Sequence, residues 1–404
     1  MRVAIIGGGA GGFFSAIHVK ENHPSAEVVI FEKSKRVLSK VKISGGGRCN
    51  VTNSETSIKL LSDAYPRGNK KLKQAFTEFS TQDCQKWFTD RGVPLVTQSD
   101  HCVFPESQSS QSIIDCFMAE VIRLNIEIKM SHKVKELKPL GEVIALHFDG
   151  DEEQIEVFDK VIVATGGSPK NSGLLWLERL GHKIENPVPS LFTFNMPNEG
   201  VTTLMGIVVE NAKVSIQSTK LKSEGPLLLT HWGMSGPAIL KLSAFGARIL
   251  EEFNYNFKIQ VNWVDELNNE VVAGVIRKII EEHPAKHLKG IRPFGLPERL
   301  WVYLLEKSDL DTNKKWPELG KKGLNKLVNV LTNDIYQVEG KTTFKDEFVT
   351  CGGVSLESID CKTMQSKVVP NLYFTGEVMD IDGITGGYNF QSAWTTAYIA
   401  AKLG

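Results

Sequence analysis

Short, uninterrupted apolar runs followed closely by glycine stand out in the pattern of hydrophobic and polar positions. They occur at Val3–Ile6, within "KVIVATGG" at residues 160–167, and within "NLYFTGE" at residues 371–377. Continuous runs of this kind are typical of strands buried on both faces of a sheet. The first run continues through a glycine turn and a helix to a second strand, "EVVIFE". The pattern predicts an α/β domain whose strands come from both ends of the chain.

The middle of the chain has a different pattern. Residues from about 191 to 216 alternate apolar and polar positions, which predicts antiparallel strands, and Pro237 suits the first turn of a helix. From Asp265 to about Thr332 apolar residues recur at helical spacing. We predict an α/β domain at 1–190, a strand-rich insert at 191–264, a helical subdomain at 265–335, and return strands with the rest of the α/β domain at 336–404.

The first turn has the glycine spacing of a dinucleotide-binding fold. Gly7, Gly9 and Gly12 fit G-x-G-x-x-G and lie between a strand and a helix. Gly7 allows the tight turn, Gly9 allows a close approach to a pyrophosphate, and Gly12 allows close packing of helix on sheet. Glu32 ends the second strand at the distance expected for an acid that binds ribose hydroxyls. An acid here favours FAD or NAD over NADP.

The segment "KISGGGRCNVTN" at residues 42–53 contains one thiol, Cys49. Dithiol chemistry requires a resolving cysteine, and the segment has none. The glycine triplet would instead let backbone N–H groups surround an anion, and Arg48 would add a fixed positive charge. We interpret the segment as a cofactor-binding loop in which Cys49 is a small packing residue.

Several longer motifs make the chain resemble one bacterial flavoprotein family. "SGGGRCNVTN", "LLLTHWGMSGPAIL", "CGGVSL" and "GEVMDIDGITGGYNFQSAW" are similar to motifs of the BaiN/RdsA-type (aminoacetone-oxidase-like) NAD(P)/FAD-dependent oxidoreductases, and the resemblance covers essentially the whole chain. It implies a discontinuous Rossmann-like FAD-binding domain of the two-dinucleotide type. The absence of a second G-x-G-x-x-G turn argues against a separate NAD domain.

The predicted residues for non-covalent FAD come from these motifs and from the turns after the apolar runs. They are Gly7, Gly9, Ala10, Gly11, Gly12, Glu32, Lys33, Lys42, Ser44, Gly45, Gly46, Gly47, Arg48, Cys49, Asn50, Val134, Ala164, Thr165, Gly166, Gly376, Glu377, Gly386, Gly387, Tyr388 and Asn389. The predicted catalytic residues are Tyr388, at the start of the last helix, and His231 in "THWGMSGPA".

Composition narrows the class of protein. The 404 residues include 47 Lys and Arg and 47 Asp and Glu, for a net charge of +0, so no global field favours nucleic acid or an anionic membrane. Six scattered cysteines show no metal-ligand or disulfide-framework spacing, which is typical of a reduced cytoplasmic protein. No apolar stretch is long enough for a membrane span. We therefore expect no metal and no membrane, and we make no prediction of oligomeric state.

The leading functional prediction is an FAD-dependent oxidoreductase of a small organic substrate. It would reduce an unsaturated or carbonyl compound with NAD(P)H, and the insert would cap the flavin. The alternatives are an oxygen-dependent amine oxidase, an FAD-dependent RNA-modifying enzyme, and a non-catalytic FAD-binding protein. The neutral net charge argues against RNA, because such enzymes need a basic face.

Overall fold

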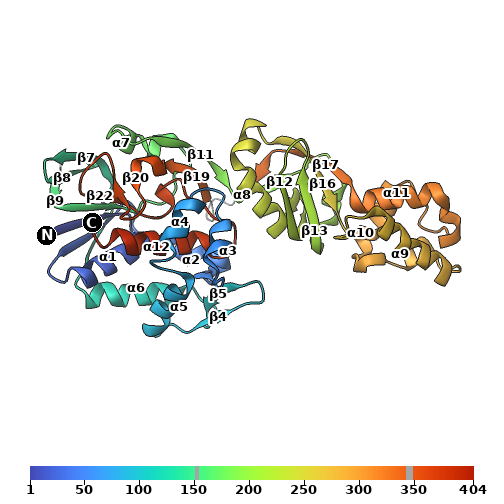
Figure 1. The fold of residues 1–404 in the computed structure, drawn as a ribbon, viewed down its shortest axis with the longest axis horizontal. Helices are drawn as coiled ribbons and strands as arrows, with labels where there is room; N and C mark the ends of the chain where they lie inside the picture. Colours follow the sequence, from blue (N-terminus) through green and yellow to red (C-terminus); the bar gives the residue numbers. More distant parts are fainter. Residues whose placement is uncertain (151–153, 343–348) are drawn as a thin grey trace. The chain divides into compact units, whose positions relative to one another are not determined.

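The computed structural model describes residues 1–150, 154–342 and 349–404, and it divides the chain into two compact units (Figure 1). Unit 1 comprises Met1–Ser190 and Phe344–Gly404, and unit 2 comprises Leu191–Thr343. The predicted fold class is confirmed: the chain has a Rossmann-like α/β domain with strands from both chain ends and an inserted, strand-rich domain.

Unit 1 is organised around a seven-stranded sheet with the order β20-β21-β22-β10-β1-β2-β6. The five strands from β22 to β6 are parallel to their neighbours, so their carboxyl ends meet at one edge. The apolar runs seen in the sequence form the buried centre of this sheet. Its strands are β1 (Arg2–Ile6), β2 (Glu27–Glu32), β6 (Glu127–Met130), β10 (Lys160–Val163), β20 (Ile359–Asp360), β21 (Gln365–Ser366) and β22 (Leu372–Phe374).

Three smaller sheets complete the strands of unit 1. They are formed by β3 (Thr52–Asn53), β5 (Cys102–Pro105) and β4 (Leu95–Thr97); by β7 (Val134–Leu140), β8 (Val143–Phe148) and β9 (Ile155–Phe158); and by β11 (Ile184–Ser190) and β19 (Val349–Val354).

The helices of unit 1 surround these sheets, and α1 packs against both α6 and α12. Buried aromatic side chains such as Phe14, Phe117 and Trp394 fill the space between these three helices. The helices are α1 (Ala10–Asn22), α2 (Ser39–Gly47), α3 (Ile58–Asp63), α4 (Asn69–Ala75), α5 (Thr81–Asp90), α6 (Gln111–Arg123), α7 (Leu175–Glu178) and α12 (Tyr388–Ala400).

Unit 2 has an antiparallel seven-stranded sheet and its own hydrophobic core. The strand order is β17-β16-β13-β14-β15-β12-β18, and α8 (Pro237–Glu252), with Pro237 in its first turn, packs on β14. The strands are β12 (Thr193–Asn195), β13 (Val208–Ile216), β14 (Lys222–Thr230), β15 (Gly233–Ser235), β16 (Asn256–Asn262), β17 (Asp334–Glu339) and β18 (Lys341–Thr342). The remaining α-helices are α9 (Asn269–Glu282), α10 (Glu298–Lys307) and α11 (Gly320–Thr332).

One predicted boundary requires correction. The return to the α/β domain was predicted from residue 336, but β17 pairs with β16 along its whole length, and β18 pairs with β12. Residues up to 342 therefore belong to the sheet of unit 2. The region of the predicted return strands also includes residues 343–348, which lie outside the described residues.

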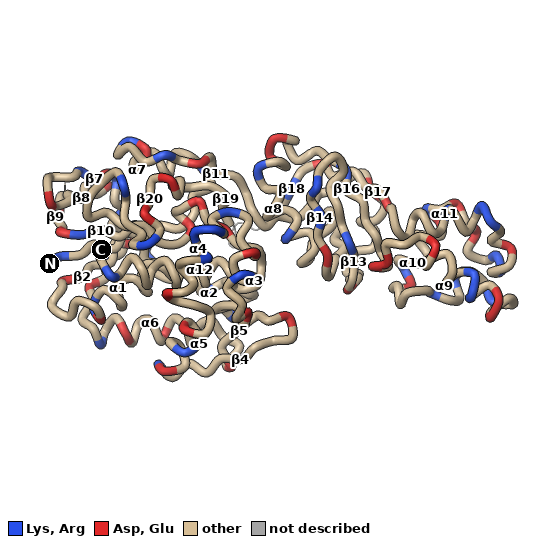
Figure 2. Tube along the Cα trace, viewed as in Figure 1, with Lys and Arg blue, Asp and Glu red and all other residues tan. Residues whose placement is uncertain are grey.

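Charge is unevenly distributed along the trace. Lysine positions gather on α2 and α4 of unit 1 (Figure 2). Among the described residues, no helix is both long and apolar enough to cross a membrane.

Candidate functional site

The glycine turn after β1 is held by very close backbone contacts. A Cβ on Gly12 would lie 1.9 Å from the carbonyl oxygen of Gly7, and a Cβ on Gly7, whose φ is +117°, would lie 2.4 Å from the Ala164 oxygen. Only glycine fits at these two positions. At Gly9, by contrast, a Cβ would meet nothing within 4 Å. The turn therefore packs tightly on one side and is open where α1 begins.

Glu32 places its carboxylate on the same turn. Its Oε2 accepts from the backbone N–H of Gly8 and its Oε1 from that of Ser34, both at 2.8 Å. Lys33 is exposed beside Glu32. The His132 N–H donates to the Glu32 carbonyl oxygen, and Val134, two residues later, begins β7. The end of β2 thus brings the predicted acid to the glycine turn.

The predicted residues after β10 adjoin this turn. The Ala164 N–H donates to the Ile6 carbonyl oxygen at 2.8 Å, and Thr165 and Gly166 follow with exposed or partly exposed surface. Gly166 has a φ of +73° and open space at its Cβ position. Two neighbouring parallel strands therefore end in adjacent turns, as the parallel order of the sheet requires.

The glycine triplet forms a sharp turn at the end of α2. Gly45, Gly46 and Gly47 have φ values of +57°, +68° and +85°, and Cβ positions at Gly46 and Gly47 meet nothing within 4 Å. Arg48 folds back over this turn: its Nε donates to the Gly45 oxygen at 3.2 Å, and its guanidinium lies 4.1 Å from the centre of the Phe104 ring. Preceding Ser44 hydrogen-bonds locally to Val41.

Two predicted cofactor-binding residues of this segment, Cys49 and Lys42, make contacts within the protein. Cys49 has no exposed surface, so it supports the turn from inside. The Lys42 ammonium donates to Gln111 Oε1 at 2.7 Å and is thereby directed toward α6. Both placements follow from the neighbouring elements, because α6 packs on α2 and β5 pairs with the chain just after Cys49.

Cys49 is also inert as an acid. Burial raises its pKa to about 12, against the smaller effect of a hydrogen bond from Ser44. The structure does reveal a thiol neighbour that the sequence did not, because Cys49 contributes to raising the pKa of buried Cys84 on α5. Both thiols are free and buried, and a thiol held protonated is a poor nucleophile.

The third turn of the site follows β22. Gly376 has a φ of +72°, and its N–H donates to Thr396 on α12. Glu377 accepts from the Thr350 N–H at 2.8 Å and from Lys40 Nζ at 2.9 Å. A Cβ on Gly167 would lie 2.5 Å from Glu377 Oε1, so this carboxylate also adjoins the turn after β10.

The segment before α12 is held by β3. With its carboxamide turned so that oxygen and nitrogen both find partners, Asn50 accepts from the Gly387 N–H at 3.0 Å and donates to the Thr52 oxygen at 2.9 Å. Asn53 Nδ2 donates to the Gly386 oxygen at 3.1 Å. A Cβ on Gly387 would lie 2.4 Å from the Thr52 backbone. The motif that contains Asn50 and the motif that contains Gly387 therefore contact each other, and the Gly387 N–H donates to Asn50.

Tyr388 and Asn389 begin α12 and behave differently. Asn389 uses its amide on the backbone of Gly383, accepting at 2.8 Å and donating at 3.0 Å, so its side chain fixes a loop. Tyr388 is half-buried, and burial, with smaller effects of Cys102 and Glu55, raises its pKa to about 12. The phenol therefore keeps its proton throughout the physiological range.

His231 lies in unit 2, whereas Tyr388 lies in unit 1. The His231 ring is exposed and meets Trp232 edge-on, with the ring centres 4.4 Å apart. Trp232 Nε1 donates to Thr193 Oγ1 at 3.1 Å, which fixes the "THWGMSGPA" turn within unit 2. The two predicted catalytic residues are therefore anchored by separate units.

The structure adds an ion pair that the sequence did not reveal. Arg67, just before α4, donates from Nε to Asp382 Oδ1 at 2.6 Å and from Nη2 to Oδ2, and Ser190 Oγ donates to Oδ2 at 2.7 Å. Asp382 is fully buried, and burial raises its pKa while Arg67 lowers it. The "DID" within the last motif was the only available signal for Asp382, and nothing in the sequence linked it to Arg67.

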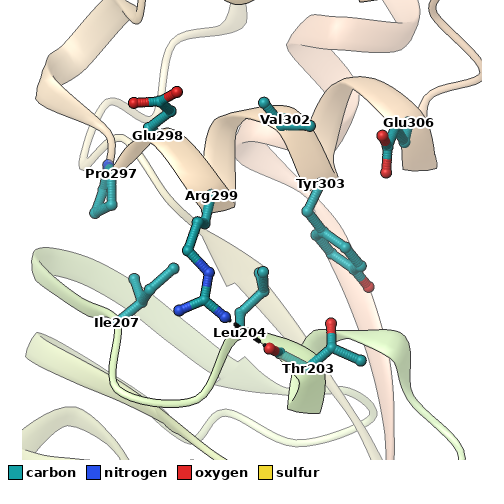
Figure 3. Close-up of a pocket in the computed structure, with 9 residues that line it drawn as sticks. All are labelled: Thr203, Leu204, Ile207, Pro297, Glu298, Arg299, Val302, Tyr303 and Glu306. Carbon is teal, nitrogen blue, oxygen red and sulfur yellow. Dashed lines mark hydrogen bonds between the residues drawn. The ribbon is translucent and has the colours of Figure 1, made fainter.

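Unit 2 contains a separate groove with a volume of about 700 Å³ (Figure 3). Arg299 points across it and donates to the Thr203 carbonyl oxygen at 2.8 Å. None of the predicted site residues lines it. The lining residues are Thr203, Leu204, Ile207, Pro297, Glu298, Arg299, Val302, Tyr303 and Glu306.

The residues of unit 1 fit FAD. The N-terminus of α1 has no side-chain cap, and open Cβ positions at Gly9, Gly46 and Gly166 leave room for a ligand beside free backbone groups. The buried Thr350 hydroxyl has no hydrogen-bond partner among the described residues and lies next to Glu377 at the same edge of the sheet. Within the described residues no group of metal-ligating side chains was found.

Comparison with known proteins agrees with this geometry. The family description "HI0933-like protein Rossmann domain" matches residues 1–403. The chain belongs to the HI0933-like family. This confirms the resemblance stated from the motifs and makes the chain a member of a family of FAD-dependent oxidoreductases.

Named relatives of this HI0933-like chain differ in substrate. It is 25% identical over 409 residues to the 3-dehydro-bile acid delta(4,6)-reductase of Clostridium scindens, covering 99% of this chain and 98% of that protein. It is 29% identical over 415 residues to the ribosomal RNA dihydrouridine synthase of Escherichia coli, covering 98% and 96%. A 3-ketosteroid-delta4-(5alpha)-dehydrogenase from Rhodococcus jostii shares the fold, with a TM-score of 0.52, 11% identity, and coverage of 99% and 96%.

Proposed function

We propose that this chain reduces a carbon–carbon double bond conjugated to a carbonyl group, using bound FAD and NAD(P)H as the electron donor. The observation that carries the proposal is that two relatives matched along their whole length bear names for this one type of reduction. A delta(4,6)-reductase of a 3-dehydro compound and a dihydrouridine synthase both saturate a double bond conjugated to a carbonyl.

The chemistry of this reduction assigns separate roles to FAD and to the protein. Saturation of such a bond adds a hydride to one carbon and a proton to the other, and bound FAD supplies the hydride-transfer chemistry. The chain would hold FAD through Gly9, the α1 N-terminus, Glu32 and Glu377. We assign the proton to Tyr388, because its pKa of about 12 keeps it protonated and because it is half-exposed beside Gly387.

An anaerobic experiment tests the proposal. The purified protein with FAD is mixed with NADH or NADPH, and bleaching of the flavin is followed; a conjugated cyclic ketone is then added. We expect reoxidation of the flavin with formation of the saturated ketone. Bleached flavin that is reoxidised by oxygen but by no conjugated carbonyl compound would contradict the proposal, and amine-driven bleaching would support the amine oxidase.

The role of Tyr388 has a matched control. Tyr388→Phe should slow reduction about 100-fold or more, the range for loss of a general acid, while flavin bleaching by NAD(P)H is unchanged. Tyr398 lies in the same helix, and its ring stacks on Phe79. Tyr398→Phe removes only its hydroxyl and should leave the rate unchanged. Equal rates for both variants would remove Tyr388 from the mechanism.

A second candidate function is reduction of a uracil base in RNA. The uracil double bond is conjugated to a carbonyl, so it requires the same chemistry as a conjugated ketone. Two observations favour it: the 29% identity to the dihydrouridine synthase, and a strongly basic stretch in unit 1 that the neutral net charge conceals. Mass spectrometry of RNA treated with protein, FAD and NADPH should show a gain of two hydrogens per modified uridine.

A further inference from the structure

Positive charge is concentrated in one stretch of unit 1. Between Lys33 and Lys73 the chain has eleven lysines and arginines but only two acidic residues, Glu55 and Asp63, although the whole sequence has 47 of each kind. A ligand at the surface responds to charges within about a Debye length, roughly 8–10 Å, and not to the net charge of the chain. The zero net charge therefore hides a local field.

Most of this charge is uncompensated. Lys40 pairs with Glu377 and Arg67 with Asp382, while Lys42 and Arg48 donate to neutral glutamines. The other seven cations are exposed and form no ion pair with any described residue: Lys33, Lys35, Arg36, Lys59, Lys70, Lys71 and Lys73.

Helix α4 carries three of these lysines and is attached to the segment that leads to Tyr388. Arg67, which precedes α4, binds buried Asp382, and a Cβ on Gly68 would lie 2.7 Å from Ile381. The helix also packs on α12, whose first residue is Tyr388. Buried contacts therefore fix α4 relative to the candidate site; α4 and α12 are labelled in Figure 1.

Two neighbouring segments extend this basic area. Helix α3, with Lys59, packs on α4. Burial raises the pKa of Cys361, Lys71 and Lys367 lower it, and Asp360 raises it, which places Lys367 of the β21–β22 connection, together with the acid Asp360, near α4. We call Lys59, Lys70, Lys71, Lys73 and Lys367 the α3–α4 surface. Within α3 and α4 themselves, the acidic residue is Asp63.

The form of the charge indicates the kind of ligand. A small anion is usually held by a buried, planar guanidinium fork, but these cations are exposed, flexible ammonium groups spread over three segments. Exposed lysines of this kind suit repeated, sequence-independent contacts with a phosphate backbone. The phosphates of FAD are accounted for by the glycine turns, which lie at the ends of β1 and β10.

We propose that the α3–α4 surface binds the phosphate backbone of RNA and so holds a target base beside the Tyr388 segment. The inference rests on the second candidate function, and it assigns the surface through which that substrate is held.

Binding can be measured without turnover. A fluorescein-labelled single-stranded RNA of about 20 nucleotides is titrated with the FAD-loaded protein at several salt concentrations, and anisotropy is recorded. The triple variant Lys70→Gln/Lys71→Gln/Lys73→Gln should bind at least tenfold more weakly near 0.1 M salt. The slope of log K against log salt should fall by about 2, since each lost phosphate contact on a single strand contributes about 0.7.

The matched control is Lys314→Gln/Lys321→Gln/Lys322→Gln in unit 2, which removes the same charge from another exposed lysine cluster. It should bind RNA like the wild type, and a triple Lys→Arg variant of α4 should restore binding. An α4 glutamine variant with wild-type affinity, or an equal loss in the control, would overturn the assignment. FAD content and the flavin spectrum confirm that each variant is folded.

The outcomes separate the two proposals. If the chain reduces a small conjugated ketone but α4 variants bind RNA normally, the surface is wrong and the reductase stands. If RNA binding depends on α4 but no conjugated carbonyl compound is reduced, the reductase is wrong and the surface stands.

Discussion

Unit 1 and unit 2 each bury a carboxylate and satisfy it with a long cation, but they place the pair differently. In unit 1, Asp382 is bound by Arg67 and Ser190 in the segment that leads to Tyr388. In unit 2, Asp334 is bound by Lys307 Nζ at 2.5 Å and by Trp263 Nε1 at 2.9 Å, and it ties α10 to the sheet. The same arrangement, a buried carboxylate paired with a cation, therefore lies in the candidate site of unit 1 and in the internal packing of unit 2.

The two units also differ in their cysteines, in their predicted FAD-binding residues and in the packing of their glycines. All six cysteines and all the predicted FAD residues lie in unit 1. In the first turn of unit 1, a Cβ on Gly7 or Gly12 would clash with backbone atoms, whereas a Cβ on the exposed Gly274 in α9 of unit 2 would meet nothing within 4 Å. Thiol labelling and FAD release therefore report on unit 1 alone, which lets experiments test the comparison unit by unit.

The largest effect is expected from Gly12→Ala. Its Cβ would lie 1.9 Å from the Gly7 oxygen, so the turn after β1 must move, at a cost of roughly 4 kcal/mol or more, and FAD binding should be lost. Gly9→Ala is the control: its Cβ meets no protein atom, so unfolding of the ligand-free chain should be unchanged while FAD binds more weakly. Urea unfolding and FAD titration measure both, and equal destabilisation by the two variants would contradict the close-packing account.

The next effect concerns the buried carboxylates. Asp382→Asn leaves the largely buried Arg67 without its charge partner, which typically costs about 3–5 kcal/mol. Asp334→Asn removes the partner of the exposed Lys307 and should cost less. We expect FAD release and faster thiol labelling only for Asp382→Asn. Asp90→Asn, in an exposed pair with Lys86, should cost under about 0.5 kcal/mol. Release of FAD by Asp334→Asn would show that the two carboxylates are not confined to separate roles.

A smaller effect is expected at Cys49. Cys49→Ala should retain FAD and lose about 1 kcal/mol of stability. Because the folded pKa of about 12 is above the ordinary value of 9.0, the thiol favours folding below pH 9, and this contribution is lost as pH rises from 9 toward 12. The advantage of wild type over Cys49→Ala should therefore shrink above about pH 9, as measured by urea unfolding. An advantage that grows with pH would mean that Cys49 ionises in the folded protein.

The smallest effect has the opposite sign. Gly274→Ala in α9 should stabilise unit 2 by about 0.5–1 kcal/mol, because alanine loses less backbone entropy in a helix and the added Cβ meets open space. Tryptophan fluorescence in urea should show the gain, and FAD affinity should not change. A loss of stability would mean that Gly274 has a packing role.

Motifs that depend on local geometry were predictable from the sequence. The apolar runs, the glycine spacing and Glu32 specify a parallel sheet with a dinucleotide turn, because close packing of a turn admits only glycine and because a doubly buried strand must be apolar. The resemblance of the longer motifs pointed to the family. The same information could not show that Cys49 is enclosed or that Lys42 is directed toward Gln111, because both depend on α6 and β5, which come later in the chain.

The sequence alone thus determined the fold class, the position of the glycine turns and the acid at the end of β2. Only the tertiary structure decided that Arg67, Ser190 and Asp382 meet, that Asn50 binds Gly387, and that β17 belongs to unit 2. The reason is physical: glycine sterics and strand burial act between near neighbours in the chain. Ion pairs and strand pairing join residues far apart in sequence, and their partners are chosen by the packing of the whole unit.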